Sequence, residues 1–313
     1  MSLAFVIDAL VTVVGVTTPI LLAATGELVA EKSGVINLGV EGMMLIGAVT
    51  AFAVAFDFGP DLGDFAPWVA VLSAALAGAV SSMLFAVLAL SLGSNQVATG
   101  LALTIFGIGL SSLIGAGYVG MTVPSFDSIF PDRLAADPVG RVLFGYSPLV
   151  YFALVMVFAV GWFLNRTRAG LVLRAVGEND NSAHSIGYPV ITIRYAAIAF
   201  GGALAGIAGS YFSMVITPMW AEQMTAGRGW IALALVVFSG WRAGRLLAGA
   251  YFFGVLMTLE LYAKASGFSF LPSQFWAAMP YIMAVVVLAV ISARGVTGSE
   301  APACLGRPFL PSS

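Results

Sequence analysis

The sequence predicts an all-α, polytopic transmembrane helix bundle with about nine spans. Of its 313 residues, 60% are hydrophobic and only 9% are charged, whereas a soluble domain carries about 25% charged residues because its surface faces water. A spanning helix needs about 20 mostly apolar residues. The length therefore accommodates nine crossings with short loops, and we expect a single transmembrane domain over residues 1–313 with no separate soluble domain.

The spans are expected where apolar runs are bounded by polar or Gly/Pro-rich breaks. The first run carries Asp8 and lacks a basic leader, so it is interpreted as a retained span rather than a signal peptide. The seventh is too short to cross alone, which predicts a tilted, interrupted or re-entrant segment. The nine segments are residues 3–24, 35–56, 66–91, 96–117, 148–165, 195–217, 228–241, 246–263 and 275–292.

Basic residues in the short loops predict the orientation, because Lys and Arg are enriched on the cytoplasmic side. The loop 166–194, the turn 242–245 and the tail 293–313 carry arginines and are expected inside, whereas the loop 57–64 has three aspartates and no basic residue. The connection 118–147 also falls outside. This places the N-terminus outside and the C-terminus inside.

Glycine is frequent within the spans, and one run, GGALAGIAG, spaces small residues for close helix contact. Small residues at four-residue spacing let helix backbones approach closely in lipid. The residues expected to pack in this way are Gly202, Gly206 and Gly209.

The stretch GELVAEKSGVINLGVEG, residues 26–42, concentrates polar side chains between two apolar runs. If this stretch is helical, Gly34, Asn37 and Glu41 share one face, and a carboxylate there must face other helices or a water-filled path rather than lipid. The alternative is that Asn37 and Glu41 hydrogen-bond to neighbouring helices or pair with Lys32. The candidate pathway residues are Glu31, Asn37, Glu41, Asn95 and Gln96.

The loop 166–194 predicts a short helix over residues 179–186. Asn179 is a good N-cap, Asp180 suits the positive end of the helix dipole, and Gly187 followed by Pro189 stops the helix. This short helix either docks onto a soluble partner or is an ordinary amphipathic connector. The candidate docking residues are Glu178, Asn179, Asp180, Ala183 and Gly187, while His184 is expected to be exposed.

Several chemistries are excluded by what the sequence lacks. It has no Walker A loop, no G-x-S-x-G, no H-E-x-x-H and no Cys/His cluster with metal spacing. We therefore expect no enzyme site, no metal and no cofactor on this chain. The net charge of −2 argues against nucleic acid, and the single cysteine, Cys304, allows no internal disulfide.

Three stretches resemble the inner-membrane permease subunits of ABC importers of the ribose, simple-sugar and branched-chain amino-acid superfamily. GELVAEKSGVINLGVEGMMLIGA resembles the nucleoside and purine branch closely, and RAVGENDNSAHSIG and GRGWIALALVVFSGWRAG are similar to the wider superfamily. The resemblance implies a bacterial inner-membrane permease that pairs with a sister permease, a cytoplasmic ATPase carrying ATP and Mg, and an extracytoplasmic substrate-binding protein. It also implies that residues 179–186 form the coupling helix, although Asp180 stands where the family usually has Pro.

The resemblance therefore implies alternating access driven by a partner ATPase, with a nucleoside or nucleobase as the expected substrate. A ribose-type sugar is the first alternative. An ion-coupled carrier using Asp8, Glu41 or Glu260 is a second, and a structural or enzyme-anchoring subunit without a pathway is a third.

Overall fold

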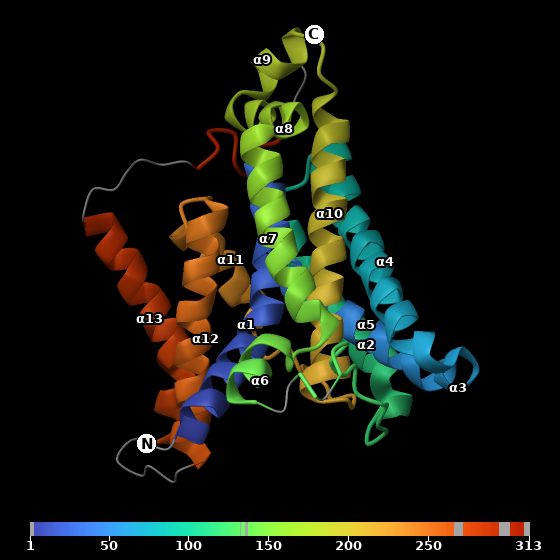
Figure 1. Ribbon diagram of the computed structural model, residues 1–313. Coiled ribbons are helices and arrows are strands. Elements are labelled where there is room, and N and C mark those ends of the chain that lie inside the picture. The colour runs from blue at the N-terminus through green and yellow to red at the C-terminus, as the bar shows by residue number, and fades with distance from the viewer. Residues whose placement is uncertain (1–2, 132, 135–136, 266–271, 294–300, 310–313) are drawn as a thin grey trace.

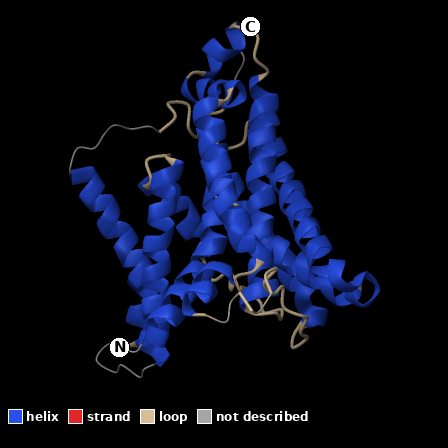
Figure 2. Cartoon of the chain, viewed as in Figure 1, coloured by secondary structure: helices blue, strands red, loops and turns tan. Residues whose placement is uncertain are grey.

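The chain forms a bundle of long α-helices in the computed structural model shown in Figure 1. The structure describes residues 3–131, 133–134, 137–265, 272–293 and 301–309. Within these ranges all regular elements are helical (Figure 2), with only isolated β-bridges between loops. The predicted all-helical class is confirmed.

Seven of the described helices are long and apolar enough to cross a membrane. They are α1 (Leu3–Lys32), α2 (Val40–Asp57), α4 (Ala66–Ala86), α5 (Gln96–Gly115), α7 (Pro148–Arg166), α10 (Val190–Tyr211) and α12 (Ala243–Ala265). Single π-helical turns extend α4 to Ser91 and α10 to Ile216. The other two predicted spans coincide with α11 (Arg228–Phe238), which is only 11 residues long, and α13 (Ser273–Ala293). The count of nine spans is therefore not confirmed.

Two predicted boundaries were wrong. The first helix continues to Lys32 instead of ending near residue 24, because its last two turns are buried among other helices rather than lying at the membrane surface. The second begins at Val40 rather than at residue 35, because residues 33–39 are not helical. Gly34, at φ +93°, adopts a left-handed conformation that favours glycine. We call residues 33–39 the link segment.

Short helices lie at the two ends of the bundle (Figure 1). The structure places α8 (Arg168–Glu178) and α9 (Asp180–Ser185) beyond one end, and α3 (Gly59–Leu62) and α6 (Pro138–Phe144) at the other. Of these four, only α9 was predicted. The arginine-rich loop and the aspartate-rich loop thus lie at opposite ends, as the orientation argument requires; which end faces the cytoplasm stays a prediction.

Helix α10 lies at the centre of the bundle and packs against α1, α2 and α4. The three glycines of its small-residue run lie where backbones cross. A Cβ atom on Gly202 would overlap Ser82, one on Gly206 would overlap the carbonyl of Ala74, and one on Gly209 would overlap the carbonyl of Met44. Any side chain at these positions would push the helices apart.

Candidate functional site

The link segment carries irregular backbone through the protein interior, where Ser33, Val35 and Asn37 are fully buried. Its backbone N–H and C=O groups need partners there, because an unpaired polar group costs several kcal/mol away from water. The Ile36 N–H donates to Gln96 Oε1 at 2.9 Å, and the Thr104 hydroxyl donates to the Leu38 carbonyl at 2.9 Å.

Two of the predicted pathway side chains therefore support this backbone. Asn37 accepts a hydrogen bond from the Gly39 N–H at 2.9 Å, and Gln96 also donates to the Arg307 carbonyl at 3.4 Å. Asn95 instead lies exposed at the start of α5, where it caps the helix by accepting from the Ala98 N–H at 3.0 Å.

The structure does not bring Gly34, Asn37 and Glu41 onto one helical face, so that prediction was wrong. The link segment breaks the helix, and only Glu41 lies in α2. Glu41 points to the start of α11. Its Oε1 accepts from the Thr225 hydroxyl at 2.6 Å and the Gly227 N–H at 2.8 Å, and its Oε2 accepts from the Gly229 N–H at 2.6 Å.

These contacts make Glu41 a capping group supplied from another helix. The first N–H groups of a helix have no partner within it, and its N-terminus carries partial positive charge, so a carboxylate there is stabilising. The fit is close: a Cβ atom on Gly229 would lie 2.7 Å from Glu41 Cα and Oε2. Glycine at position 229 is what allows the carboxylate to reach the helix end.

Left-handed residues interrupt the chain on both sides of α11. Gln223, Ala226 and Gly227 have φ of 52°, 48° and 80° before it, and Gly240 and Trp241 have φ of 60° and 57° after it. At 1.5 Å per residue an 11-residue helix spans about 16 Å, roughly half of the hydrocarbon thickness. The structure agrees with the prediction of an interrupted segment here.

A second buried carboxylate holds the other end of α11. Glu31, 3% exposed on α1, accepts a hydrogen bond at 2.6 Å from Trp241 Nε1. Glu41 and Glu31 thus hold the start and the end of this half-helix. The role of Trp241 was not predicted, because a tryptophan after an apolar run is ordinary in a membrane protein.

Glu27 lies one helical turn before Glu31 and is 1% exposed. Neither of its carboxyl oxygens has a hydrogen-bond partner among the described atoms. Such groups are rare, and each one calls for an explanation, such as a water, an ion or a ligand. Glu27 was not among the predicted pathway residues, although it belongs to the same polar stretch.

Cavities lie at both ends of the bundle. One of about 660 Å³ at the α8–α9 end is lined by charged and aromatic side chains, among them Lys32, Arg174 and Trp241. One of about 840 Å³ at the other end is lined by residues of α3 and of the connection after α5, including Asp64 and Asp127.

The predicted short helix is present as α9. Asn179 caps it by accepting from the Ser182 N–H at 2.9 Å, and Gly187, at φ +94°, follows its end. His184 is exposed, as expected. Sequence reasoning missed α8 directly before it.

Two of the five predicted docking side chains point inward. Ala183 is 3% exposed and packs with Val176 and Val190, and Asp180 is 7% exposed. The outward positions are Glu178, Asn179, Asn181, Ser182, His184 and Ser185. The exposed surface of α9 is therefore formed by this second set rather than by Ala183 or Asp180.

Asp180 forms a buried ion pair with Arg194, whose side chain is fully buried, at 3.1 Å. Arg194 Nε also donates to the Ser33 carbonyl at 3.1 Å. One guanidinium therefore joins α9, the start of α10 and the link segment. This role of Arg194 was not predicted, because in the sequence Arg194 is one of several arginines in the loop 166–194.

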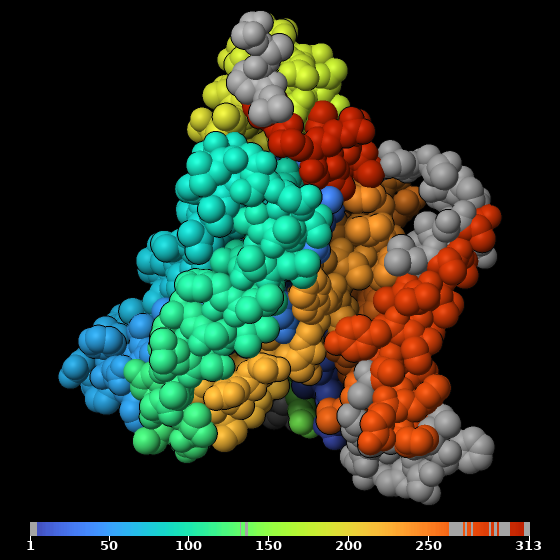
Figure 3. Space-filling view, turned by 180° about the vertical axis from the view of Figure 1, so that it is seen from behind, coloured from blue at the N-terminus to red at the C-terminus, as the bar shows by residue number. Residues whose placement is uncertain are grey.

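Residues 301–309, the C-terminal segment, lie across the same region. The Cys304 N–H donates to the Gly177 carbonyl at 2.9 Å, and the Gly306 N–H donates to the Gly34 carbonyl at 3.1 Å. The ring of Phe309 lies 5.5 Å from that of His184. Figure 3 shows this segment in red, against the helices at that end of the bundle. It binds α8, α9 and the link segment together.

No group of three or more His, Cys, Asp or Glu side chains suitable for a metal occurs among the described residues.

Residues 9–291 match the family model described as the permease component of branched-chain amino acid transport systems. The chain is 40% identical over 268 residues, 84% of its length and 80% of the relative's, to a Haloferax volcanii protein with the provisional name of glucose ABC transporter permease. It is 30% identical to a guanosine ABC transporter permease of Bacillus subtilis, covering 93% of both chains. It is 28% identical to a nucleoside ABC transporter permease of Lactococcus lactis, covering 90% of both. No solved structure gives a significant match.

Proposed function

Because the chain belongs to the family of permease components described for branched-chain amino acid transport systems, we propose that it forms the membrane path of an ABC importer for a nucleoside or nucleobase. The family match over residues 9–291 is the observation that carries the proposal. The chain is a transporter subunit of the inner membrane and not an enzyme. ATP and Mg belong to the partner ATPase.

The substrate class rests on the named relatives. The guanosine and nucleoside permeases align with nine-tenths or more of the chain. The relative named for glucose is more similar, at 40% identity, which keeps a simple sugar as the second candidate. Both classes are uncharged and rich in hydroxyl groups, and sites for such ligands use a few well-placed polar groups.

Uptake by the assembled transporter separates the two candidates. The permease, its sister permease, its ATPase and its binding protein are reconstituted in liposomes, and ATP-dependent uptake of radiolabelled guanosine, adenosine, ribose and glucose is measured. We expect uptake of a nucleoside with no uptake of glucose. Uptake of glucose alone would replace the nucleoside assignment and leave the permease role intact.

Among the buried polar side chains, Glu27 is the one that we place on the substrate path. Its carboxyl group is buried and unpartnered among the described atoms, so a passing hydroxyl or amide group can satisfy it. Glu31, Asn37, Glu41 and Gln96 are already engaged with protein groups. These four side chains would hold the helices that line the path in position rather than contact the substrate.

The ATPase is proposed to dock on the outward face of α9. A soluble partner needs a polar, accessible surface, and Ser182, His184 and Ser185 supply one beyond the ends of α7 and α10. A sister permease completes the membrane unit, and the binding protein delivers substrate at the opposite end.

Movement of α9 would reach α2 through buried contacts. Asp180 on α9 pairs with Arg194, and Arg194 holds the link segment through the Ser33 carbonyl. The link segment leads directly into α2. Asp180→Asn should lower the coupling of ATP hydrolysis to uptake, whereas Asp61→Asn, at an exposed aspartate of α3 at the other end of the bundle, should not. Equal coupling in both variants would reject this route.

The ion-coupled carrier is the remaining alternative. Two of the three acidic residues that it would use already form contacts within the protein. Asp8 forms an ion pair with Arg141 at 2.9 Å, and Glu41 caps α11. Uptake that persists without ATP and follows a proton gradient would favour the carrier.

A further inference from the structure

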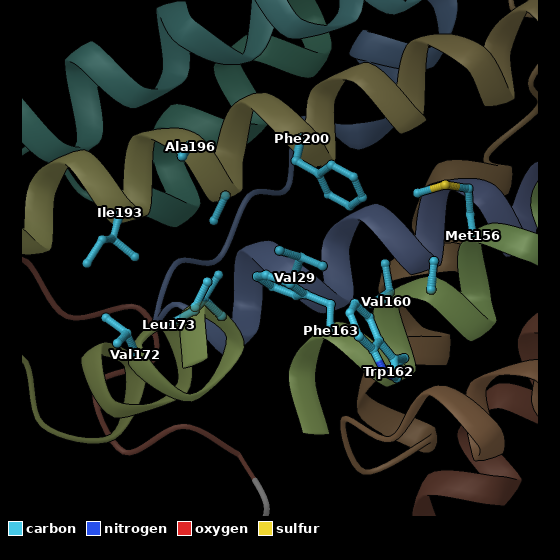
Figure 4. Close-up of a pocket in the computed structure, with 13 residues that line it drawn as sticks. Val29, Met156, Val160, Trp162, Phe163, Val172, Leu173, Ile193, Ala196 and Phe200 are labelled. Carbon is cyan, nitrogen blue, oxygen red and sulfur yellow. The ribbon is translucent and has the colours of Figure 1, made fainter. Parts of the chain in front are cut away.

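A groove of about 630 Å³ opens on the side of the bundle, away from the polar groups described above. Figure 4 shows side chains from α1, α7, α8 and α10 pointing into one common space. They include Val29, Phe163, Leu173, Ile193 and Phe200, and every lining side chain is apolar except for the indole nitrogen of Trp162. The volume lies in the range of about 300–1,000 Å³ that is typical of small-molecule sites.

The rim of the groove carries the signature of a membrane–water interface. Trp162 lines the groove and is 64% exposed, and tryptophan is enriched where apolar core meets headgroups. Arg166 follows Trp162 by four residues on α7, and Arg168 precedes the lining residue Val172 by four on α8. Residues four apart share a helix face, so both arginines lie on the groove side.

Both arginines are exposed, and neither has an ion-pair or hydrogen-bond partner in the ranges that the structure describes. Two free guanidinium groups beside an apolar slot complement a molecule with an anionic head and a hydrocarbon tail. Guanidinium binds phosphate oxygens in a bidentate manner. Helix α8 is part of the loop 166–194, which is expected to face the cytoplasm.

From this geometry we infer that the groove binds one anionic phospholipid, with an acyl chain among α1, α7 and α10 and its phosphate at Arg166 and Arg168. The site is distinct from the proposed substrate path. It lies directly under α8, which leads into α9, so the bound lipid supports the base of the docking helix.

Native mass spectrometry of the delipidated, assembled transporter, titrated with phosphatidylglycerol or phosphatidylcholine, tests the proposal. Ala196→Trp fills the groove and should abolish the tightest lipid-binding event, whereas Ala102→Trp, at an exposed alanine of α5, should not. Arg166→Gln with Arg168→Gln should reduce the preference for phosphatidylglycerol by roughly ten- to thirty-fold, from about 1 kcal/mol per basic residue. Arg245→Gln is the matched exposed control.

Fluorescence gives an independent readout that does not need the bulky variant. Brominated phosphatidylglycerol should quench tryptophan emission, and Trp162→Phe should remove a larger part of this quenching than Trp68→Phe, at an exposed tryptophan of α4. Equal lipid retention by wild type and Ala196→Trp, or a loss of subunits from the Ala196→Trp complex, would overturn the proposal. The second result would mean that a protein covers this face.

Discussion

The carboxylate of Glu41 accepts three hydrogen bonds from the start of α11 while it is 5% exposed. A buried carboxylate is tolerated when it is fully hydrogen-bonded, and here two of the donors are backbone N–H groups at the positive end of a helix. The carboxylate of Glu41 and the N–H groups at the start of α11 thus satisfy each other's hydrogen-bonding needs. This explains why an acid is placed within an apolar span without assigning it to the substrate.

Glu41→Gln separates an anchoring role from a pathway role. The amide keeps the shape, but it loses the charge and places an NH₂ group against N–H donors, which should cost about 1.5–3 kcal/mol. We expect less assembled complex, with uptake per purified complex near the wild-type value. Glu222→Gln, on the exposed part of the same loop, should change neither quantity. Normal assembly with reduced uptake per complex would instead place Glu41 on the path.

Gly229, which lies against this carboxylate, gives a second prediction that rests on steric overlap. In Gly229→Ala the new Cβ atom would lie 2.7 Å from the backbone and carboxylate of Glu41, and overpacking of this kind typically costs about 1–3 kcal/mol. The melting temperature of the purified complex should fall. Gly244→Ala, where nothing lies within 4 Å of the new atom, should leave it unchanged. Equal melting temperatures for the two variants would contradict the assigned contact.

At the scale of the element, α9 exposes different side chains from those that its sequence suggests. Polar spacing and capping predict that the helix exists, but a six-residue helix between two loops gives no periodic pattern from which its buried face can be read. Ala183 faces Val176 and Val190 instead of solvent. Bulk at position 183 should therefore damage folding rather than docking.

The outward position Ser182 tests docking without this complication. Ser182→Arg puts bulk and charge on the exposed face of α9 and should uncouple ATP hydrolysis from uptake, while the protein stays inserted at normal levels because surface changes have little effect on stability. Ala183→Arg should reduce the amount of inserted protein. ATPase activity and uptake are measured on the same proteoliposomes. Full uptake by Ser182→Arg would leave α9 without a docking role.

The long helices could be predicted because a span requires a continuous apolar run, and α4, α5, α7 and α12 begin and end within a few residues of the predicted bounds. The link segment could not, because its partners, Gln96, Thr104 and Arg194, come from distant parts of the chain. The contacts of the candidate site could not be predicted for the same reason. Glu41 stands out as a charge within a span, but Thr225 and Gly229 acquire meaning only when α11 is folded against α2.

At the scale of the whole molecule, charge is sorted between the two ends of the bundle. Arg168, Arg174 and the C-terminal segment lie with α8 and α9, whereas Asp61 and Asp64 lie with α3 at the other end. Positively charged loops are retained on the cytoplasmic side. The sidedness decides whether α9 can meet an ATPase at all, so every proposal on coupling depends on it.

Cysteine accessibility tests this sidedness directly. In a Cys304→Ser background, single cysteines at Asp61 and Ser128 should react with an impermeant maleimide added to intact cells, because both positions lie at the end assigned to the outside. A cysteine at Ser182 should react only after the membrane is permeabilised, and its exposure on α9 ensures that a lack of reaction in intact cells reflects the membrane and not burial. Cys304→Ser is a mild background, because the hydroxyl can still donate to the Glu178 carbonyl that Sγ contacts at 3.5 Å. Labelling of position 182 in intact cells would reverse the orientation, and α9 would then lie on the wrong side of the membrane to couple ATP hydrolysis to transport.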